Sequence, residues 1–470
     1  MSSAAAPRRR RTLRLALTVT LALLAAALLA LRPDRAARVA AGLAAHLACS
    51  MHFVGAQGPD ASARMLKVMA GPLSHLIASR IEEDARAASG SFLGITLARA
   101  HYTQGYGCRL EYPGQAPAPA PRPSPPPLAA DGFAPASGIV TPPTAELARA
   151  LDGVFAEHSG SAPKQVQAVV VVLKDHVIAE RYADGVGPET PLLSWSVAKS
   201  LTNALVGILV RSGRLAPGLP LAAPEWQHAG DARARITLED LMRMQSGLAA
   251  LESGSPADPV ARMEFMHADM AGFAAALPLR IAPATQFEYT SANTLLVARR
   301  LGEIIGGGAQ GLRTFAEREL FAPLHMQGVT LEFDGAGTFI GASFAWAPAR
   351  SYAHFGTLYL NDGVTPQGER LLPPGWVEWS RRSLLGAPYG AGFWTNDGDS
   401  RFARLRVAAG FPRDGFFASG VLGQRIYIVP SAQVVVARFG ASAPPDYGIE
   451  DDLPLIAAAV REAGGQRQPQ

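Results

Sequence analysis

Lysine is scarce in this chain of 470 residues. Four of its 43 basic residues are lysines, at positions 67, 164, 174 and 199. Charged residues of both signs make up 17% of the chain and hydrophobic residues 48%, which excludes a disordered protein and favours a globular one. The net charge of +4 comes mainly from arginines within residues 8–14, and no interleaved basic and aromatic patch follows them. We therefore expect no nucleic acid as a partner.

Several motifs of known enzyme classes are also absent. The chain has no G-x-S-x-G segment, which disfavours the α/β-hydrolase fold. It has no H-E-x-x-H segment, and its ten histidines are scattered, so a zinc hydrolase would lack its ligands. It has no G-x-x-x-x-G-K-[ST] loop to hold phosphates. We expect neither a metal nor an organic cofactor.

Cysteine is nearly absent, with Cys49 and Cys108 as the two examples. An even number of cysteines in an exported chain predicts a disulfide between them. Two unpaired, buried thiols are the alternative. The sequence gives no signal for an oligomeric state.

The N-terminus has the layout of a secretory signal or a signal anchor. Arginines within residues 8–14 precede an uncharged run from Leu15 to Leu31. Seventeen residues are at the short end of what crosses a bilayer, where about 20 is usual. No clear cleavage site follows before Arg32, so we expect residues 1–34 to form a transmembrane anchor and the membrane to be a partner. The body would then lie in the periplasm or outside the cell, anchored to the inner membrane, or be secreted if the signal is cleaved.

Three further segments follow the predicted anchor. Residues 35–112 look like a small helical module, since apolar residues recur at helical spacing between positions 65 and 77. Residues 113–143 are rich in proline and alanine and predict an extended, semi-rigid linker. Residues 144–465 predict an α/β domain, with a hairpin turning at Lys174 and Asp175 and further strands between positions 415 and 439. Strands at both ends with helices between them predict one antiparallel sheet, flanked by helices and a helical subdomain.

Ser196 and Lys199 are the strongest candidates for chemistry. They lie three residues apart in an apolar, helical segment and so share one helix face. A serine hydroxyl needs a base to become a nucleophile, and a desolvated lysine can accept its proton. Arginine stays protonated in proteins, so a lysine kept in an arginine-using chain suggests a specific role. The structural alternative is a lysine extending to solvent beside a serine that caps the helix.

Several ordered segments resemble one enzyme family. The segment "SWSVAKS" around Ser196 resembles the S-x-x-K motif of class C-like serine β-lactamases, penicillin-binding proteins, esterases and 6-aminohexanoate-dimer hydrolases. "FEYTSANTLLVARRLGEIIG" resembles their second motif and puts the family's catalytic tyrosine at Tyr289. "DGFFASGVLGQRIYIVPS" resembles the third motif, on the strand beside the active site. "ITLEDLMRMQSGL", "SYAHFGTLYLNDGV" and "LLPPGWVE" match further segments, and the resemblance covers roughly Gln167 to Phe439.

This resemblance implies a two-step acyl transfer. Ser196 attacks a carbonyl while Lys199 and Tyr289 act as general base and acid. The resemblance also implies an oxyanion hole formed by the backbone N–H groups of Ser196 and Val421. Candidate substrate-binding residues are Ser291, Ser419, Gly420, Trp195 and Trp394. Core packing is the alternative role for Tyr289 and for both tryptophans.

Two positions depart from the β-lactamase pattern. The second motif ends in Ser291 where asparagine is usual, and the third begins with Ala418 where a lysine usually helps to hold a substrate carboxylate. We therefore expect hydrolysis of a small-molecule ester or amide, close to the esterase and 6-aminohexanoate-dimer hydrolase branch. The alternatives are a β-lactamase or D,D-carboxypeptidase, and a catalytically silent binding protein of the cell envelope.

Overall fold

The computed structural model describes residues 18, 32–58, 60–115, 117–123, 132–135, 138–157, 163–444 and 447–465. Apart from Thr18, the predicted transmembrane run Leu15–Leu31 lies outside these residues. Within the described residues, no helix combines the length and the apolar character needed to cross a membrane. The membrane anchor therefore stays a prediction.

The larger domain is built on a six-stranded antiparallel sheet with the strand order β10-β11-β12-β13-β5-β6. Its strands are β5 (Val166–Leu173), β6 (His176–Tyr182), β10 (Trp394–Thr395), β11 (Phe416–Gly420), β12 (Gln424–Val429) and β13 (Val434–Gly440). The hairpin between β5 and β6 turns at Lys174 and Asp175, as the sequence predicts. Pairing of β13 with β5 joins the two ends of the domain, so the predicted sheet is confirmed.

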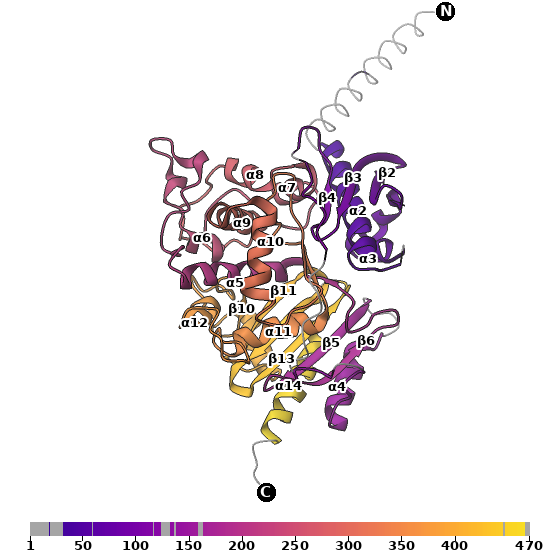
Figure 1. The fold of residues 1–470 in the computed structure, drawn as a ribbon, viewed down its shortest axis with the longest axis vertical. Helices are drawn as coiled ribbons and strands as arrows, with labels where there is room; N and C mark the ends of the chain where they lie inside the picture. The colour runs from indigo at the N-terminus through magenta and orange to yellow at the C-terminus, as the bar shows by residue number, and fades with distance from the viewer. Residues whose placement is uncertain are drawn as a thin grey trace, which may run out of the picture.

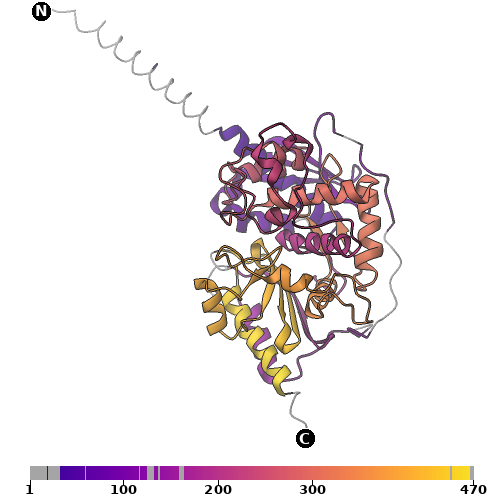
Figure 2. The same ribbon diagram turned by 90° about the vertical axis from the view of Figure 1, so that its left-hand side faces the viewer.

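The sheet separates two hydrophobic cores because its strands alternate their side chains between both faces. Val169 and Val171 belong to the core beneath α4 (Ala145–Phe155) and α14 (Ile449–Gly465). Val170 and Val172 belong to the larger core, which contains α5 (Ala198–Arg211) and α11 (Ala349–Leu360). In Figure 2 the sheet and α14 form the lower half of the molecule, beneath the helices.

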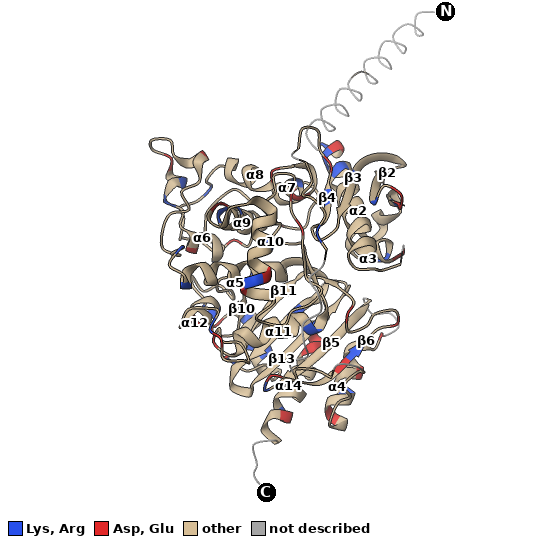
Figure 3. Ribbon diagram, viewed as in Figure 1, with Lys and Arg blue, Asp and Glu red and all other residues tan. Residues whose placement is uncertain are grey.

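A helical lobe sits on the side of the larger core (Figure 1). It contains α6 (Leu238–Met242), α7 (Pro259–Met266), α8 (Met270–Ala276), α9 (Ser291–Ile305) and α10 (Gly308–Ala316). A small sheet of β7 (Leu192–Leu193), β9 (Ala345–Ala347) and β8 (Thr330–Leu331), in that order, adjoins the lobe. Two further helices of the larger domain alternate with strands: α12 (Trp376–Arg381) precedes β10, and α13 (Arg401–Ala408) lies between β10 and β11. Figure 3 shows charged residues at scattered positions along a largely uncharged ribbon.

The N-terminal module, defined here as residues 33–112, is only half helical. It contains α2 (Pro33–Phe53), α3 (Asp60–Ala70) and then β1 (Ile77–Glu82), β2 (Ala87–Phe92), β3 (Ile95–Thr103) and β4 (Gly107–Leu110). The prediction of a mostly helical module is therefore wrong for its second half. The α-helical part ends at Ala70 and the 3₁₀ helix η1 (Gly71–Leu76) follows it, and the strands after η1 use small residues that periodicity does not reveal. Gly90 is one example, since a Cβ there would lie 1.9 Å from the backbone oxygen of Ala41 in α2.

The module packs directly on the larger domain. The predicted disulfide between Cys49 and Cys108 is confirmed and joins α2 to β4. Helix α2 lies against α7 so closely that a Cβ on Gly42 would meet the backbone oxygen of Phe265 at 2.7 Å. The proline-rich linker therefore does not hold the module apart from the domain.

Candidate active site

Ser196 lies in a single 3₁₀ turn, η2 (Trp195–Val197), between β7 and α5. The preceding Trp195 has a φ of 43°, a left-handed conformation that costs about 1–3 kcal/mol for a residue with a side chain. Ser194 holds this turn in place, because its amide donates to the Ala345 carbonyl at 2.8 Å and its hydroxyl accepts from the Ala345 amide at 3.0 Å. Ser196 is itself only half-buried. The strained turn thus presents its hydroxyl where a substrate can reach it.

The Lys199 amine contacts the Ser196 hydroxyl directly. Its Nζ lies 2.9 Å from Ser196 Oγ and 3.0 Å from both Ser291 Oγ and the Ala342 carbonyl oxygen. The side chain is 3% exposed. This burial lowers the pKa of Lys199, and the nearby carboxylates of Glu252 and Glu264 partly oppose the effect. A larger fraction of neutral amine follows, and neutral amine is what a general base requires.

Tyr289 is the third residue of a trio with Ser196 and Lys199, and its pKa is shifted in the direction opposite to that of Lys199. Lys199 Nζ lies 4.9 Å from the centre of the Tyr289 ring, and Ser196 is near enough to the Tyr289 hydroxyl to oppose in part the rise in pKa that burial causes. Burial and the two carboxylates raise the pKa of Tyr289, so its phenol keeps its proton. Within this trio, Lys199 is suited to accept a proton and Tyr289 to donate one.

The end of β11 meets the nucleophile turn at Gly420. A Cβ on Gly420 would lie 2.5 Å from the Ser194 carbonyl oxygen and 3.0 Å from the Ser196 amide nitrogen. Only glycine fits this approach without displacing backbone. Val421 follows directly in the chain, as the proposed oxyanion hole requires, and is 36% exposed.

The remaining predicted site residues lie in different surroundings. Ser291 contacts Lys199, and Trp394 stacks on the Tyr289 ring with 5.5 Å between ring centres. Ser419 is half-buried on β11. Trp195 is 5% exposed and packs on Phe344 behind the nucleophile, with 5.5 Å between ring centres. Its surroundings are those of a core residue.

Two acidic residues of the site have no counterpart in the sequence prediction. Glu252 accepts a hydrogen bond from Ser291 Oγ at 3.1 Å and a second from the Ser291 amide. Glu264 is 7% exposed, accepts from Ser343 Oγ, and has its pKa raised to about 7 by burial. Glu252 precedes a Ser-Gly-Ser segment and Glu264 follows Arg262 by two residues, so no local pattern marks either of them. Neither has a spacing that links it to Ser196.

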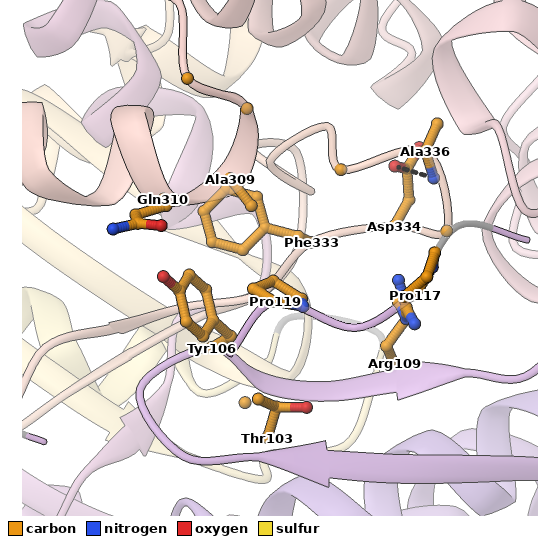
Figure 4. A pocket seen from close by; sticks show the side chains of 15 residues that line it. Thr103, Tyr106, Arg109, Pro117, Pro119, Ala309, Gln310, Phe333, Asp334 and Ala336 are labelled. Atoms are coloured by element: carbon orange, nitrogen blue, oxygen red, sulfur yellow. Dashed lines mark hydrogen bonds between the residues drawn. The ribbon is translucent and has the colours of Figure 1, made fainter. Parts of the chain in front are cut away.

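A separate cavity of about 290 Å³ lies between the N-terminal module and the helical lobe. Its lining comes from β3, β4, the start of α10, the proline-rich segment, which contributes Pro117 and Pro119, and the loop after β8 (Figure 4). Asp334 in that loop accepts from the Ala336 amide, and burial raises its pKa to about 6. The described residues that line the cavity include no serine, cysteine or lysine.

Comparison with known proteins identifies the family of this chain. Residues 151–461 match the family described as Beta-lactamase. The chain belongs to the beta-lactamase family. Ser196, Lys199, Tyr289 and Gly420 all fall within the matched residues, whereas the N-terminal module lies outside them.

Individual relatives resemble this chain over about two thirds of its length. The 6-aminohexanoate-dimer hydrolase of Paenarthrobacter ureafaciens is 26% identical over 63% of this chain and 79% of its own. A penicillin-binding protein homologue from Caulobacter crescentus has a TM-score of 0.53 at 18% identity, covering 69% of this chain and 99% of its own. The hydrolase EstCE1, with promiscuous acyltransferase activity, has a TM-score of 0.51 at 16% identity, covering 68% and 98%. Family and relatives identify a hydrolase of the β-lactamase fold.

Proposed function

We propose that this member of the beta-lactamase family is a serine hydrolase that cleaves an ester or amide bond through an acyl-enzyme on Ser196. The observation that carries the proposal is the 2.9 Å contact between Lys199 Nζ and Ser196 Oγ, made by a buried lysine whose pKa is lowered. That contact supplies a nucleophile and its base in one hydrogen bond.

In the acylation step, Ser196 Oγ bonds to the substrate carbonyl carbon as its proton passes to the neutral amine of Lys199. The backbone N–H groups of Ser196 and Val421 stabilise the negative oxygen that forms, and such donors commonly contribute about 3–4 kcal/mol each. Tyr289 then donates a proton to the leaving alcohol or amine and recovers one from Lys199. The carbon–heteroatom bond breaks, and the acyl group stays on Ser196.

In the deacylation step, water attacks the acyl carbon and gives up its proton to the same Lys199 and Tyr289 pair. The ester bond to Ser196 breaks, the Ser196 hydroxyl regains a proton, and a carboxylic acid leaves. No metal or organic cofactor takes part in either step of the proposed mechanism.

The proposed substrate is a small, neutral ester or amide. Ala418 is fully buried and carries no charge, so the third motif offers no cation for a substrate carboxylate. Glu252 instead adds negative charge beside Lys199. Charge-assisted hydrogen bonds contribute about 1.5–3 kcal/mol, so the absence of this cation should weaken recognition of anionic substrates roughly 10- to 150-fold.

We also propose that the catalytic domain works outside the cytoplasm, held at the inner membrane by residues 1–34. The Cys49–Cys108 disulfide supports this location because disulfides persist in oxidising compartments.

Labelling and turnover test the proposed function together. Wild-type protein should react with a fluorophosphonate probe at Ser196 and hydrolyse p-nitrophenyl butyrate, with a higher kcat/KM than for a chromogenic cephalosporin. Ser196→Ala should lose both labelling and turnover while keeping its melting temperature, since the change removes little packing. If Ser196→Ala keeps activity within tenfold of wild type, Ser196 is not the nucleophile. Faster turnover of the cephalosporin would favour a β-lactamase. No labelling by the fluorophosphonate probe and no turnover of either substrate would favour a binding protein.

A further inference from the structure

Three groups of the N-terminal module converge on one carboxylate of the catalytic domain. Glu332, just after β8, accepts from Ser50 Oγ at 2.7 Å and from the Cys108 amide at 3.0 Å through one oxygen. Its other oxygen lies 2.8 Å from His46 Nε2. The Glu332 side chain is fully buried, and that of His46 is 1% exposed. A buried carboxylate is costly without partners, and here the module supplies them.

Glu332 and His46 also contact the chain segment 340–347, which lies beside Lys199. The Glu332 carbonyl accepts from the Ile340 amide at 2.9 Å, and the Glu332 amide donates to the Phe344 carbonyl at 3.2 Å. The His46 ring stacks on the Phe344 ring with 4.2 Å between centres. Gly107 lies so close that a Cβ there would meet Glu332 Cγ at 2.5 Å. The module therefore fixes the position of segment 340–347 through Glu332 and His46.

Segment 340–347 in turn contacts Lys199 and the turn that carries Ser196. The Ala342 carbonyl accepts from Lys199 Nζ at 3.0 Å. Ser343 donates to Glu264, one of the two carboxylates that act on Lys199. The Ala345 amide donates to Ser194 Oγ, which supports the strained turn before Ser196. One continuous set of contacts thus runs from His46 to both catalytic residues.

We infer that Glu332 is a positioning residue for the reaction and that the N-terminal module, through His46, is a required part of the catalytic apparatus. The inference rests on the proposed Ser196 acyl-enzyme and extends it to a module outside the family match. By holding Glu332, the module fixes the distance between Lys199 and Ser196. Misplacement of a catalytic group by about 1 Å can slow a reaction about 100-fold.

The test uses four variants of the full-length protein, with kcat and KM for p-nitrophenyl butyrate and the melting temperature as readouts. Glu332→Ala and His46→Ala should lower kcat about 10- to 100-fold with KM little changed, because positioning and not substrate binding is lost. His46→Gln keeps a donor in place of the ring nitrogen and should restore kcat to within about threefold of wild type. Met65→Ala is the control, since it removes a buried side chain of the module core without touching Glu332.

The inference is overturned if Glu332→Ala and His46→Ala lower only the melting temperature, as Met65→Ala should, and keep wild-type kcat. It is also overturned if His46→Gln is as slow as His46→Ala. Should Glu332→Ala fail to fold, the pair of His46 variants decides the question. Failure of the proposed function gives a different result, because Ser196→Ala would then remain active whatever the His46 variants do.

Discussion

At the scale of single residues, the site depends on how one amine is kept neutral and close to a hydroxyl. Burial favours the neutral form of Lys199, whereas Glu252 and Glu264 favour the ammonium. In the proposed mechanism, the balance of these effects sets the pH at which Ser196 can be activated. Substitutions of Lys199 and of the two glutamates test this mechanism.

Lys199→Arg keeps a positive charge but removes the ability to accept a proton at accessible pH. We expect it to be nearly as inactive as Lys199→Ala towards p-nitrophenyl butyrate. Steady-state kinetics with fluorophosphonate labelling as a second readout would check this. Substantial turnover by the arginine variant would show that position 199 has an electrostatic or structural role.

Glu252→Gln removes the carboxylate that raises the pKa of Lys199 most. Without it the amine loses its proton at lower pH, so the acid limb of the kcat/KM profile should move to lower pH. Glu264→Gln should move the limb in the same direction by a smaller amount. Glu225→Gln is a matched control, since Glu225 pairs with Arg299 away from the site. A limb that stays in place, or moves to higher pH, would contradict this account of the site.

At the scale of elements, the candidate active site forms where the end of β11, the second strand of the six-stranded sheet, meets the turn η2 before α5. Strand β11 and turn η2 touch through Gly420, and the proposed second oxyanion donor follows it in the chain. This contact depends on backbone shape and on the absence of a side chain.

Gly420→Ala tests the contact between β11 and η2. The φ of Gly420 is −121°, which any residue adopts, so its backbone conformation causes no strain. The added methyl group would instead press on the Ser194 carbonyl and the Ser196 amide. We expect kcat/KM to fall about 100-fold or more, the loss associated with an oxyanion donor. Ser419→Ala, one residue earlier, is the comparison, and equal losses in both variants would argue against a special role for the contact.

The sequence predicted elements and site residues unequally well. The β5–β6 hairpin, the C-terminal strands and the neighbouring positions of Ser196 and Lys199 follow from alternation and helical spacing, which are local. The strands β1–β4 were not predicted, because residues such as Gly90 and Ala100 are small and the alternation of apolar and polar residues around them is weak. Glu252, Glu264 and Glu332 escaped for another reason: their roles arise from contacts between segments distant in the chain, which no local pattern records.

At the scale of the whole molecule, the disulfide stabilises the module that supports the site. Cys49 and Cys108 are 59 residues apart in the chain and fully buried. Native, unreduced protein should therefore show no reaction with maleimide. The double variant Cys49→Ala/Cys108→Ala should lose about 4 kcal/mol of unfolding free energy by the chain-entropy relation, measurable by urea denaturation. Maleimide labelling of both cysteines before reduction would refute the bridge.

The pairing of β13 with β5 also sets an order of assembly on the proposed site. Ser196 and Lys199 share one short stretch of chain, whereas β11 and the sheet register that fixes it depend on Val434–Gly440, much later in the chain. A growing chain that still lacks β13 carries Ser196 and Lys199 without the strand register that places Gly420 and Val421 opposite them. Under the proposed mechanism, hydrolysis therefore starts only after β13 has been made, and a chain truncated before Val434 should be inactive.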